Sequence, residues 1–253
     1  RIDRLQGFLL FLILSSLYLK KHERKTSTCS FLFFVKMISE KLRRISCGNC
    51  NCGGENMYRI YSTLIEMVAA AVFIIPIWCI YNKLYFRSWK ITFLYMIFGF
   101  YLTAVLALVG FPNIISLKVE LTVNIIPFVY MINDFINACL NVLLFVPFGF
   151  FLPVLWKEFR NAKKLFTAGF AMTSFIEIAQ IFTGRTTDID DIITNIAGTL
   201  IGYLIAYWYT GVFTRRIVKN SKKNDFYIIC ASVIFIMFFL QPFISSLLWE
   251  MIL

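Results

Sequence analysis

The feature that most constrains this chain is a series of apolar stretches, each about 20 residues long, joined by shorter polar segments. A helix of that length crosses the ~30 Å hydrocarbon core of a bilayer and satisfies its own backbone hydrogen bonds, as a spanning segment must. The composition agrees, because hydrophobic residues make up 59% of the 253 residues and charged residues only 15%. The sequence therefore predicts an all-α, polytopic integral membrane protein with six transmembrane helices. They are expected over 62–81, 91–111, 137–156, 165–182, 192–213 and 226–248.

Basic residues mark alternate connections between these spans. Lysines and arginines lie between the first and second spans, between the third and fourth, and after the fifth, whereas the other connections carry only Lys118 and Arg185. The positive-inside rule makes the three basic connections cytoplasmic and places the 112–136 and 184–191 connections outside. The net charge of +11 is therefore a topology signal with anionic membrane lipid as its partner, and nucleic-acid binding is not expected.

Residues 1–56 depart from this pattern. The apolar run 7–19 is shorter than a span and resembles the core of a signal peptide, and the basic stretch 20–44 follows it. Residues 53–56 can be encoded by a purine-rich stretch that resembles a bacterial ribosome-binding site ahead of Met57. We therefore expect residues 1–56 to be translated upstream sequence, with a genuine disordered or peripheral extension as the alternative. The rest of the chain is divided into a transmembrane domain (57–213), a basic cytoplasmic linker (214–225) and a C-terminal transmembrane helix (226–253).

One cysteine cluster has the spacing of a metal site. Cys47, Cys50 and Cys52 could grip zinc or an iron–sulfur cluster, and Cys29 is the one candidate for a fourth thiolate. No histidine lies nearby, because His22 is the only one in the chain. We therefore expect no metal and no cofactor. A single histidine also excludes a Ser/His/Asp triad and any zinc site built on two histidines.

Polar side chains on three predicted spans are expected to meet at one depth, in the outer leaflet. Glu177 lies about two-thirds of the way along the fourth span at 1.5 Å per residue, and Ser174 and Gln180 share its helical face. Asp191 and Asn195 recur on one stripe of the fifth span. Ionisable groups at membrane depth are costly, so a cluster of them is a functional-site hypothesis by default.

Glu177 is the centre of this candidate site, because a carboxylate at membrane depth needs a partner or a proton. Arg185, two helical turns further on, is the expected counter-charge. The catalytic candidates are Glu177, Arg185 and Asp191. The ligand-binding candidates are Asn141, Ser174, Gln180, Asp188, Asp190 and Asn195.

Several of these features have a plainer explanation. The spacing of Gly198 and Gly202 is typical of close helix packing. Aspartates 188, 190 and 191 would also stabilise the N-terminus of the helix that follows them. Pro147 marks either a broken helix around a site or a tolerated bend. Glu66, near the outer end of the first span, is a further candidate for the cluster.

Four motifs in this order and spacing resemble the VanZ-like family: N-I-I-P-F (124–128), N-x-x-x-F-x-P-x-G (141–149), S-x-x-E-x-x-Q (174–180) and R-x-x-D-x-D-D-x-x-x-N-x-x-G-x-x-x-G (185–202). These are bacterial membrane proteins named for a member associated with low-level resistance to the glycopeptide teicoplanin. The resemblance covers 91–208 and implies a multi-pass protein of the bacterial cytoplasmic membrane. By motif match, the family site carries over to Asn141, Glu177, Gln180, Arg185, Asp188, Asp190, Asp191 and Asn195.

Three classes of function fit these observations. The first is a protein that binds or alters a lipid-linked cell-wall precursor at the outer leaflet and lowers susceptibility to teicoplanin. The second is a membrane-embedded enzyme in which Glu177 acts as general acid or base, or the aspartates hold a divalent cation against a phosphate. The third is a transporter or structural subunit, although the spans show no evident inverted repeat.

Overall fold

The computed structural model of the chain describes residues 54–115, 117–119, 123–124, 135–185, 187–209 and 221–252. The segment 1–53, with its cysteine cluster, lies outside the described residues. The same holds for 125–134, which include all but the first residue of the 124–128 motif, and for 210–220, which include most of the linker. Residues Glu55–Trp249 form one compact unit.

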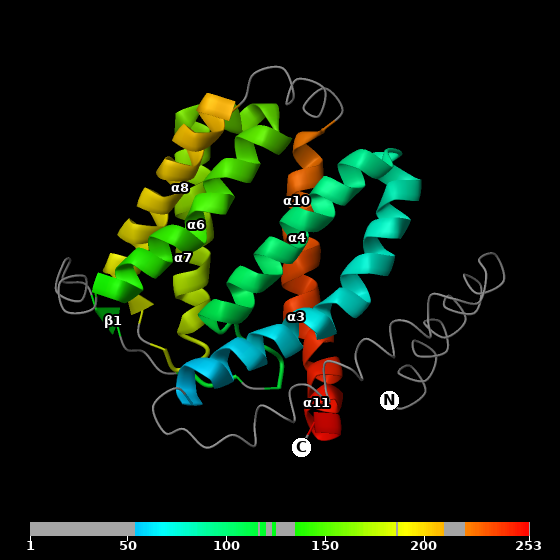
Figure 1. Cartoon of the computed structure of the whole chain (residues 1–253), viewed down its shortest axis with the longest axis vertical. Helices are drawn as coiled ribbons and strands as arrows, with labels where there is room; N and C mark the ends of the chain where they lie inside the picture. Colours follow the sequence, from blue (N-terminus) through cyan, green and yellow to red (C-terminus); the bar gives the residue numbers. More distant parts are fainter. Residues whose placement is uncertain are drawn as a thin grey trace. The chain divides into compact units, whose positions relative to one another are not determined.

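Helices make up almost all of this unit (Figure 1). Two of the long helices contain or end in a π-helical turn, and a short 3₁₀ helix joins two others. In chain order they are α3 (Gly54–Tyr81) with η1 (Asn82–Phe86), α4 (Trp89–Val109), α6 (Phe135–Leu155), η2 (Lys157–Arg160), α7 (Ala162–Gln180), α8 (Ile189–Tyr209) and α10 (Lys223–Phe235), which continues through η3 (Ile236–Leu240) into α11 (Gln241–Ile252). The two short strands, β1 (Val123–Asn124) and β2 (Thr187–Asp188), pair in parallel.

Five described helical segments are long and apolar enough to cross a membrane. They are Tyr61–Phe86, Trp89–Val109, Phe135–Leu155, Ile189–Trp208 and Asn224–Glu250. The predicted fourth span falls on α7, which differs because its 19 residues include Lys163, Lys164 and Glu177. This helix packs against α6 and α8, and its buried face includes Glu177 and Gln180. The predicted fold class, an all-α multi-span membrane protein, is confirmed.

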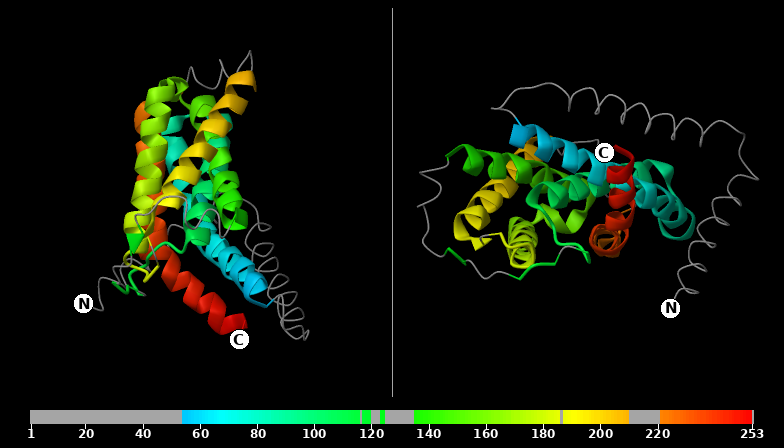
Figure 2. Two further views of the ribbon diagram at one scale, coloured as in Figure 1. Left: turned by 90° about the vertical axis from the view of Figure 1, so that its left-hand side faces the viewer. Right: turned by 90° about the horizontal axis from the view of Figure 1, so that it is seen from below.

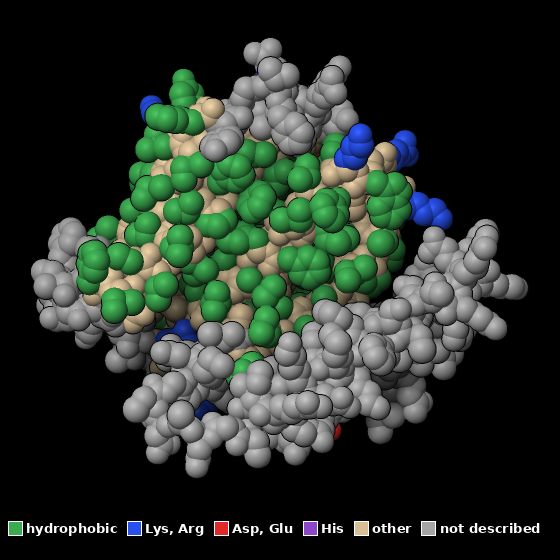
Figure 3. Space-filling view, viewed as in Figure 1, with side chains coloured by type: hydrophobic (Ala, Val, Ile, Leu, Met, Phe, Trp, Pro, Cys, Tyr) green, Lys and Arg blue, Asp and Glu red, His purple; other side chains and the backbone are tan. Residues whose placement is uncertain are grey.

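The helices alternate in direction, so their connections fall at two ends of the bundle (Figures 1 and 2). The end that we call the basic end holds the α3–α4 turn with Lys83, Arg87 and Lys90, and the α6–α7 turn with Lys157 and Arg160. The cavity end holds the C-termini of α4 and α7 and the N-termini of α6 and α8. The described part of the face seen in Figure 3 is mostly hydrophobic, with lysine and arginine side chains at its upper edge and a few more at its lower left.

Helices α6 and α8 are in backbone contact, which fixes the geometry of the cavity end. A Cβ atom on Gly198 would collide with the carbonyl oxygen of Val142, and one on Gly202 with that of Val146. Only glycine permits this approach, and small residues are how membrane helices pack closely without a hydrophobic driving force. The predicted packing role of these two glycines is confirmed.

Pro147 does not break α6, which runs unbroken from Phe135 to Leu155. Proline removes one helical hydrogen bond and frees carbonyls in the preceding turn. The hydroxyl of Tyr101 on α4 donates to the carbonyl oxygen of Leu144 in that turn, at 2.7 Å. This bond ties α4 to the turn before Pro147, next to the Leu143 carbonyl that the proline leaves without its helical donor.

Aromatic packing closes the basic end. Trp156, at the end of α6, stacks on Tyr95 with ring centroids 5.3 Å apart and meets Phe226 of α10 edge-on. The Tyr95 hydroxyl donates to Asp225 at 3.0 Å, which ties α10 to α4. These contacts tie α4, α6 and α10 together at the basic end.

Candidate functional site

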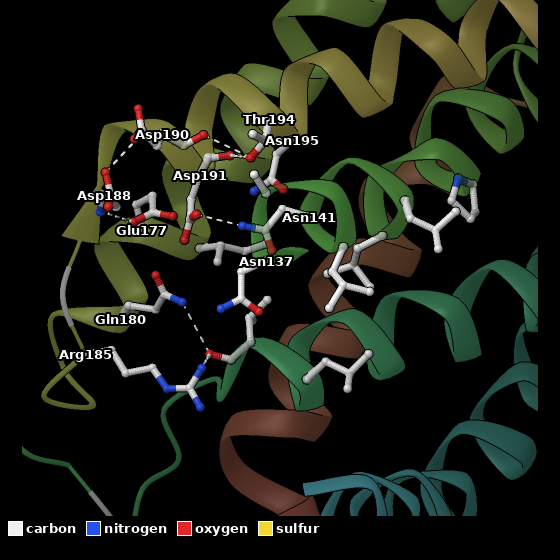
Figure 4. A pocket seen from close by; sticks show the side chains of 18 of the residues that line it. Asn137, Asn141, Glu177, Gln180, Arg185, Asp188, Asp190, Asp191, Thr194 and Asn195 are labelled. Carbon is white, nitrogen blue, oxygen red and sulfur yellow. Dashed lines mark hydrogen bonds between the residues drawn. The ribbon is translucent and has the colours of Figure 1, made fainter. Parts of the chain in front are cut away.

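A cavity of about 710 Å³ opens at the cavity end between α4, α6, α7 and α8 (Figure 4). One wall is apolar and includes Leu108, Leu140 and Leu143, all of which are exposed on the surface of the bundle. The other walls are polar and come from the first turns of α6 and α8, the last turns of α7, and Arg185. The cavity therefore joins a polar interior to the apolar outer surface. Its polar lining comprises Tyr101, Asn137, Asn141, Glu177, Gln180, Arg185, Asp188, Asp190, Asp191, Thr194 and Asn195.

Asn141 and Asp191 join the walls formed by α6 and α8. The Nδ2 group of Asn141 donates to Oδ1 of Asp191 at 2.6 Å. The contact is possible because Gly198 and Gly202, about two and three turns after Asp191 on α8, bring the two helices together. A hydrogen bond to a charged group contributes about 1.5–3 kcal/mol, so this pair fixes the position of the Asp191 carboxylate.

Glu177 anchors the turn that leads into α8. Its Oε2 atom accepts from the backbone N–H of Asp188 at 3.0 Å, and its backbone carbonyl accepts from the Thr187 hydroxyl at 3.2 Å. Asp188 in turn accepts from the N–H of Asp190 at 3.0 Å, which satisfies a donor in the first turn of α8. The predicted role of this aspartate at a helix N-terminus is confirmed.

β1 reaches the same turn from the segment before α6. Nδ2 of Asn124 donates to Oδ1 of Asp188 at 3.2 Å, beside the parallel pairing of the two short strands. The first residue of the predicted 124–128 motif therefore contacts the acidic turn at its outer side. Asp188 is held by α7, α8 and β1 together.

Arg185 does not serve as the counter-charge of Glu177 through a hydrogen bond, contrary to expectation. Its Nη1 group donates at 2.7 Å to the carbonyl oxygen of Val109, the last residue of α4. Gly110 follows Val109 with a φ of 70°. A Cβ atom at this position would collide with the guanidinium of Arg185, so glycine makes room for the arginine. A cation at a helix C-terminus is stabilised by the unpaired carbonyls there. In Figure 4, Gln180 lies between Glu177 and Arg185.

Arg185 also interacts electrostatically with Glu66 of α3. The electrostatic neighbours of Glu177 are instead Asp188 and Asp191. The two residues thus line one cavity, as predicted, but at different ends of it. The sequence could not reveal this, because the position of Arg185 depends on where α4 ends in space.

Two buried amide oxygens face the cavity without a hydrogen-bond donor from the described residues. Gln180 is 7% exposed, and its Nε2 group donates to Val109 at 3.4 Å while Oε1 has no partner. Asn195 is 4% exposed, and its Nδ2 group donates to the Thr173 hydroxyl at 3.0 Å while Oδ1 has no partner. Leaving a buried acceptor unpaired costs about 1–3 kcal/mol, so such an atom calls for a partner.

Ser174 was expected beside Glu177 and Gln180, but it does not line the cavity. Three residues turn an α-helix by about 300°, which is about 60° less than a full turn. Ser174 and Gln180 are six residues apart, so their side chains point about 120° away from each other around α7. Thr173 faces between Gln180 and Glu177 and makes the hydrogen bond to Asn195. The residue one position earlier was the better candidate on this face.

The structure adds Asn137 and Thr194 to the site. Asn137 is one turn before Asn141 on α6, a spacing of four residues that would have identified it as a neighbour on the same face. The Thr194 hydroxyl donates to the Asp190 carbonyl at 2.9 Å. Nothing in the sequence distinguishes this threonine from others in apolar helices.

The acidic residues do not converge on a common point. Asp188 contacts the first turn of α8, Asp191 pairs with Asn141, and Glu177 binds the Asp188 backbone. Among the described residues, no group of three or more histidine, cysteine, aspartate and glutamate side chains is placed to hold a metal ion. The arrangement is suited to hydrogen-bond donors from a ligand that enters the cavity.

The VanZ/LLP1 family model matches residues 92–214. Protein VanZ of Enterococcus faecium is 32% identical over 120 residues, which cover 47% of this chain and 70% of that protein. No solved structure matches the chain. The matched region contains the helices α4, α6, α7 and α8 that build the cavity, almost in full, and it excludes α3, α10 and α11. The chain belongs to the VanZ/LLP1 family of membrane proteins.

Proposed function

We propose that this protein binds the headgroup of a lipid-linked component of the cell envelope in the cavity at the outer leaflet of the bacterial cytoplasmic membrane, and thereby lowers susceptibility to teicoplanin. The observation that carries the proposal is the two-sided cavity. Leu140 and Leu143 line it and are also exposed on the outer surface, where lipid would lie. Asn141, one turn away, belongs to its polar interior. A lipid can enter such a space with its chains still in the bilayer.

The charge distribution supports an outer-leaflet position. Lys83, Lys157 and the other basic residues of the α3–α4 and α6–α7 turns gather at the basic end, which the positive-inside rule assigns to the cytoplasm. The cavity lies at the opposite end, together with Asp188, Asp190 and Asp191. A ligand would therefore reach the cavity from the outer leaflet, the surface on which teicoplanin acts.

A susceptibility assay tests this function. We would express the full chain and the Asn141→Ala and Glu177→Gln variants in a teicoplanin-sensitive bacterium and measure the minimal inhibitory concentration. The unaltered chain should raise it, and both variants should reverse the increase while reaching the membrane in equal amounts. The matched control is Asn224→Ala, an exposed asparagine at the basic end, which should behave like the unaltered chain.

A second measurement separates binding from catalysis. Purified protein would be incubated with radiolabelled lipid-linked cell-wall precursor and the lipid then recovered and chromatographed. We expect bound but chemically unchanged lipid. Conversion to a new species that depends on Glu177 would instead identify an enzyme. In the susceptibility assay, loss of both Asn141→Ala and Glu177→Gln from the membrane fraction would mean that the polar side chains of the cavity only hold the helices together.

A further inference from the structure

We propose that the cavity selects lipids whose headgroup carries a primary ammonium group, as in phosphatidylethanolamine, over lipids with an anionic headgroup. This inference rests on the proposed function and specifies the ligand of the same cavity. Three features of the cavity support this preference: the excess of acidic residues in its lining, two unpaired hydrogen-bond acceptors and its apolar wall.

The first step is the charge of the lining. Four acidic residues line the cavity, Glu177, Asp188, Asp190 and Asp191, whereas Arg185 is its one basic residue among those that the structure describes. The guanidinium already donates a hydrogen bond to the α4 carbonyl at Val109. Carboxylates in a space of low dielectric favour a nearby cation and repel a phosphate group.

The second step is the set of unpaired acceptors. Gln180 and Asn195 line the cavity, and their Oε1 and Oδ1 atoms are buried and lack a donor from the described residues. An amide oxygen only accepts hydrogen bonds, so the missing partner is a donor. A primary ammonium offers three N–H donors at one point, and a headgroup phosphate offers none. Acceptors and carboxylates in one cavity both select the same chemical group.

The third step assigns this ammonium to a lipid. Leu108, Leu140 and Leu143 line the cavity and remain exposed on the apolar surface of the bundle. A membrane lipid can keep its acyl chains in the surrounding hydrocarbon beside this wall while its headgroup enters the cavity, whereas a soluble amine has no apolar part to place there. With the ammonium among the acceptors, the phosphate would stay nearer the mouth, and the chains would pass out along α6.

Native mass spectrometry of the full chain in detergent tests the inference. Four lipids with identical acyl chains would be titrated: phosphatidylethanolamine, its N-acetylated form, phosphatidylcholine and phosphatidylglycerol. We expect phosphatidylethanolamine to bind about tenfold more tightly than each of the others, because each lacks either the charge or the full set of N–H donors. Phosphoethanolamine without acyl chains forms a separate arm and should not compete at the same concentration.

A matched pair of variants locates the recognition. Gln180→Met removes the unpaired acceptor while keeping the length of the side chain, and it should reduce the preference for phosphatidylethanolamine over its N-acetylated form about tenfold. Gln241→Met alters another buried glutamine, at the start of α11, and should leave the preference unchanged. The comparison of the two phosphatidylethanolamine forms on the unaltered chain does not depend on the folding of either variant.

The remaining outcomes separate the two proposals. Equal binding of all four lipids, or tighter binding of phosphatidylglycerol, would overturn the ammonium preference. If Asn141→Ala still weakened the binding of those lipids, the proposed binding of a lipid headgroup in the cavity would stand. If none of the four lipids binds, the ammonium inference is overturned, and the proposed function depends on the separate test with the lipid-linked precursor. If lipid binds but Asn141→Ala leaves its affinity unchanged, the lipid does not occupy this cavity and both proposals are overturned. Equal competition by soluble phosphoethanolamine would assign the cavity to a soluble amine and overturn the lipid assignment.

Discussion

Asn141 on α6 donates a hydrogen bond of 2.6 Å to the carboxylate of Asp191 on α8, and this bond joins two walls of the cavity. The two helices also touch through their backbones at Gly198 and Gly202. The polar wall of the cavity is therefore held by a rigid pair of helices. Preorganised groups lose little entropy when a ligand binds, which favours selective recognition.

The Asn141–Asp191 bond gives the first prediction. Asn141→Ala removes the donor and leaves the Asp191 carboxylate without this partner, at a cost of about 1.5–3 kcal/mol. We expect the affinity for phosphatidylethanolamine to fall about 10- to 100-fold. Native mass spectrometry measures it, with Asn224→Ala as the control at the basic end. An unchanged affinity would contradict the placement of the lipid in this cavity.

Close packing of α6 and α8 gives the second prediction. Gly202→Ala places a methyl group against the carbonyl of Val146, so the helices must separate. Overpacking of this kind costs about 1–3 kcal/mol, and the thermal unfolding temperature in detergent should fall. Ile201→Ala, at the exposed neighbouring position, should lower it much less. If both variants unfold at the same temperature, the two helices are not held in backbone contact.

Arg185 gives the third prediction, which concerns the end of α4. Arg185→Ala removes the donor to Val109, and the last turn of α4 should then open more readily. Hydrogen exchange should accelerate at the amides of Gly110 and Phe111, which bond to the carbonyls of Ala107 and Leu106. Arg185→Lys keeps a cationic donor and should preserve most of the protection. Equal exchange in all three proteins would contradict a capping role.

Glu177 gives the fourth prediction. Glu177→Gln keeps an oxygen that can accept from the Asp188 N–H but removes the ionisable carboxyl group from the cavity, so that no carboxylate can form there beside a bound ammonium. The variant should fold normally and lose part of its preference for phosphatidylethanolamine over phosphatidylglycerol. Glu177→Ala also leaves the Asp188 N–H unpaired, so it should lower the unfolding temperature by more. A Gln variant with unaltered lipid preference would mean that the charge of Glu177 does not act on the ligand.

Much of this arrangement could be predicted from the sequence. The apolar spans and the basic connections fixed which helix ends lie together, and eight of the nine candidate site residues line one cavity. This works because membrane helices are straight, have a defined length and alternate in direction. The packing of Gly198 and Gly202 was predictable for the same reason, since small residues at this spacing form one stripe of a helix.

The details that failed depend on contacts between distant segments. Arg185 was paired with Glu177 because they are neighbours in sequence, but its hydrogen-bond partner is the end of α4, 76 residues earlier. Ser174 was included on spacing alone, and the rotation of α7 against α8 selects Thr173 instead. The last predicted span is confirmed as a helical segment, but its π-helical turn at Ile236–Leu240 was not expected, although Pro242 follows it and cannot donate to the Phe238 carbonyl inside it.

The central claim is that a lipid with an ammonium headgroup enters this cavity from the outer leaflet. The most direct test is photo-crosslinking in right-side-out membrane vesicles, with a phosphatidylethanolamine that carries a diazirine near the glycerol and a free amine. The lipid would be added from outside and the labelled peptides identified by mass spectrometry. We predict labels on α6 around Leu140–Leu144 and at Leu108, lost when the amine is acetylated. Labels spread evenly over all the lipid-facing helices, or confined to α3 and α10, would contradict the claim.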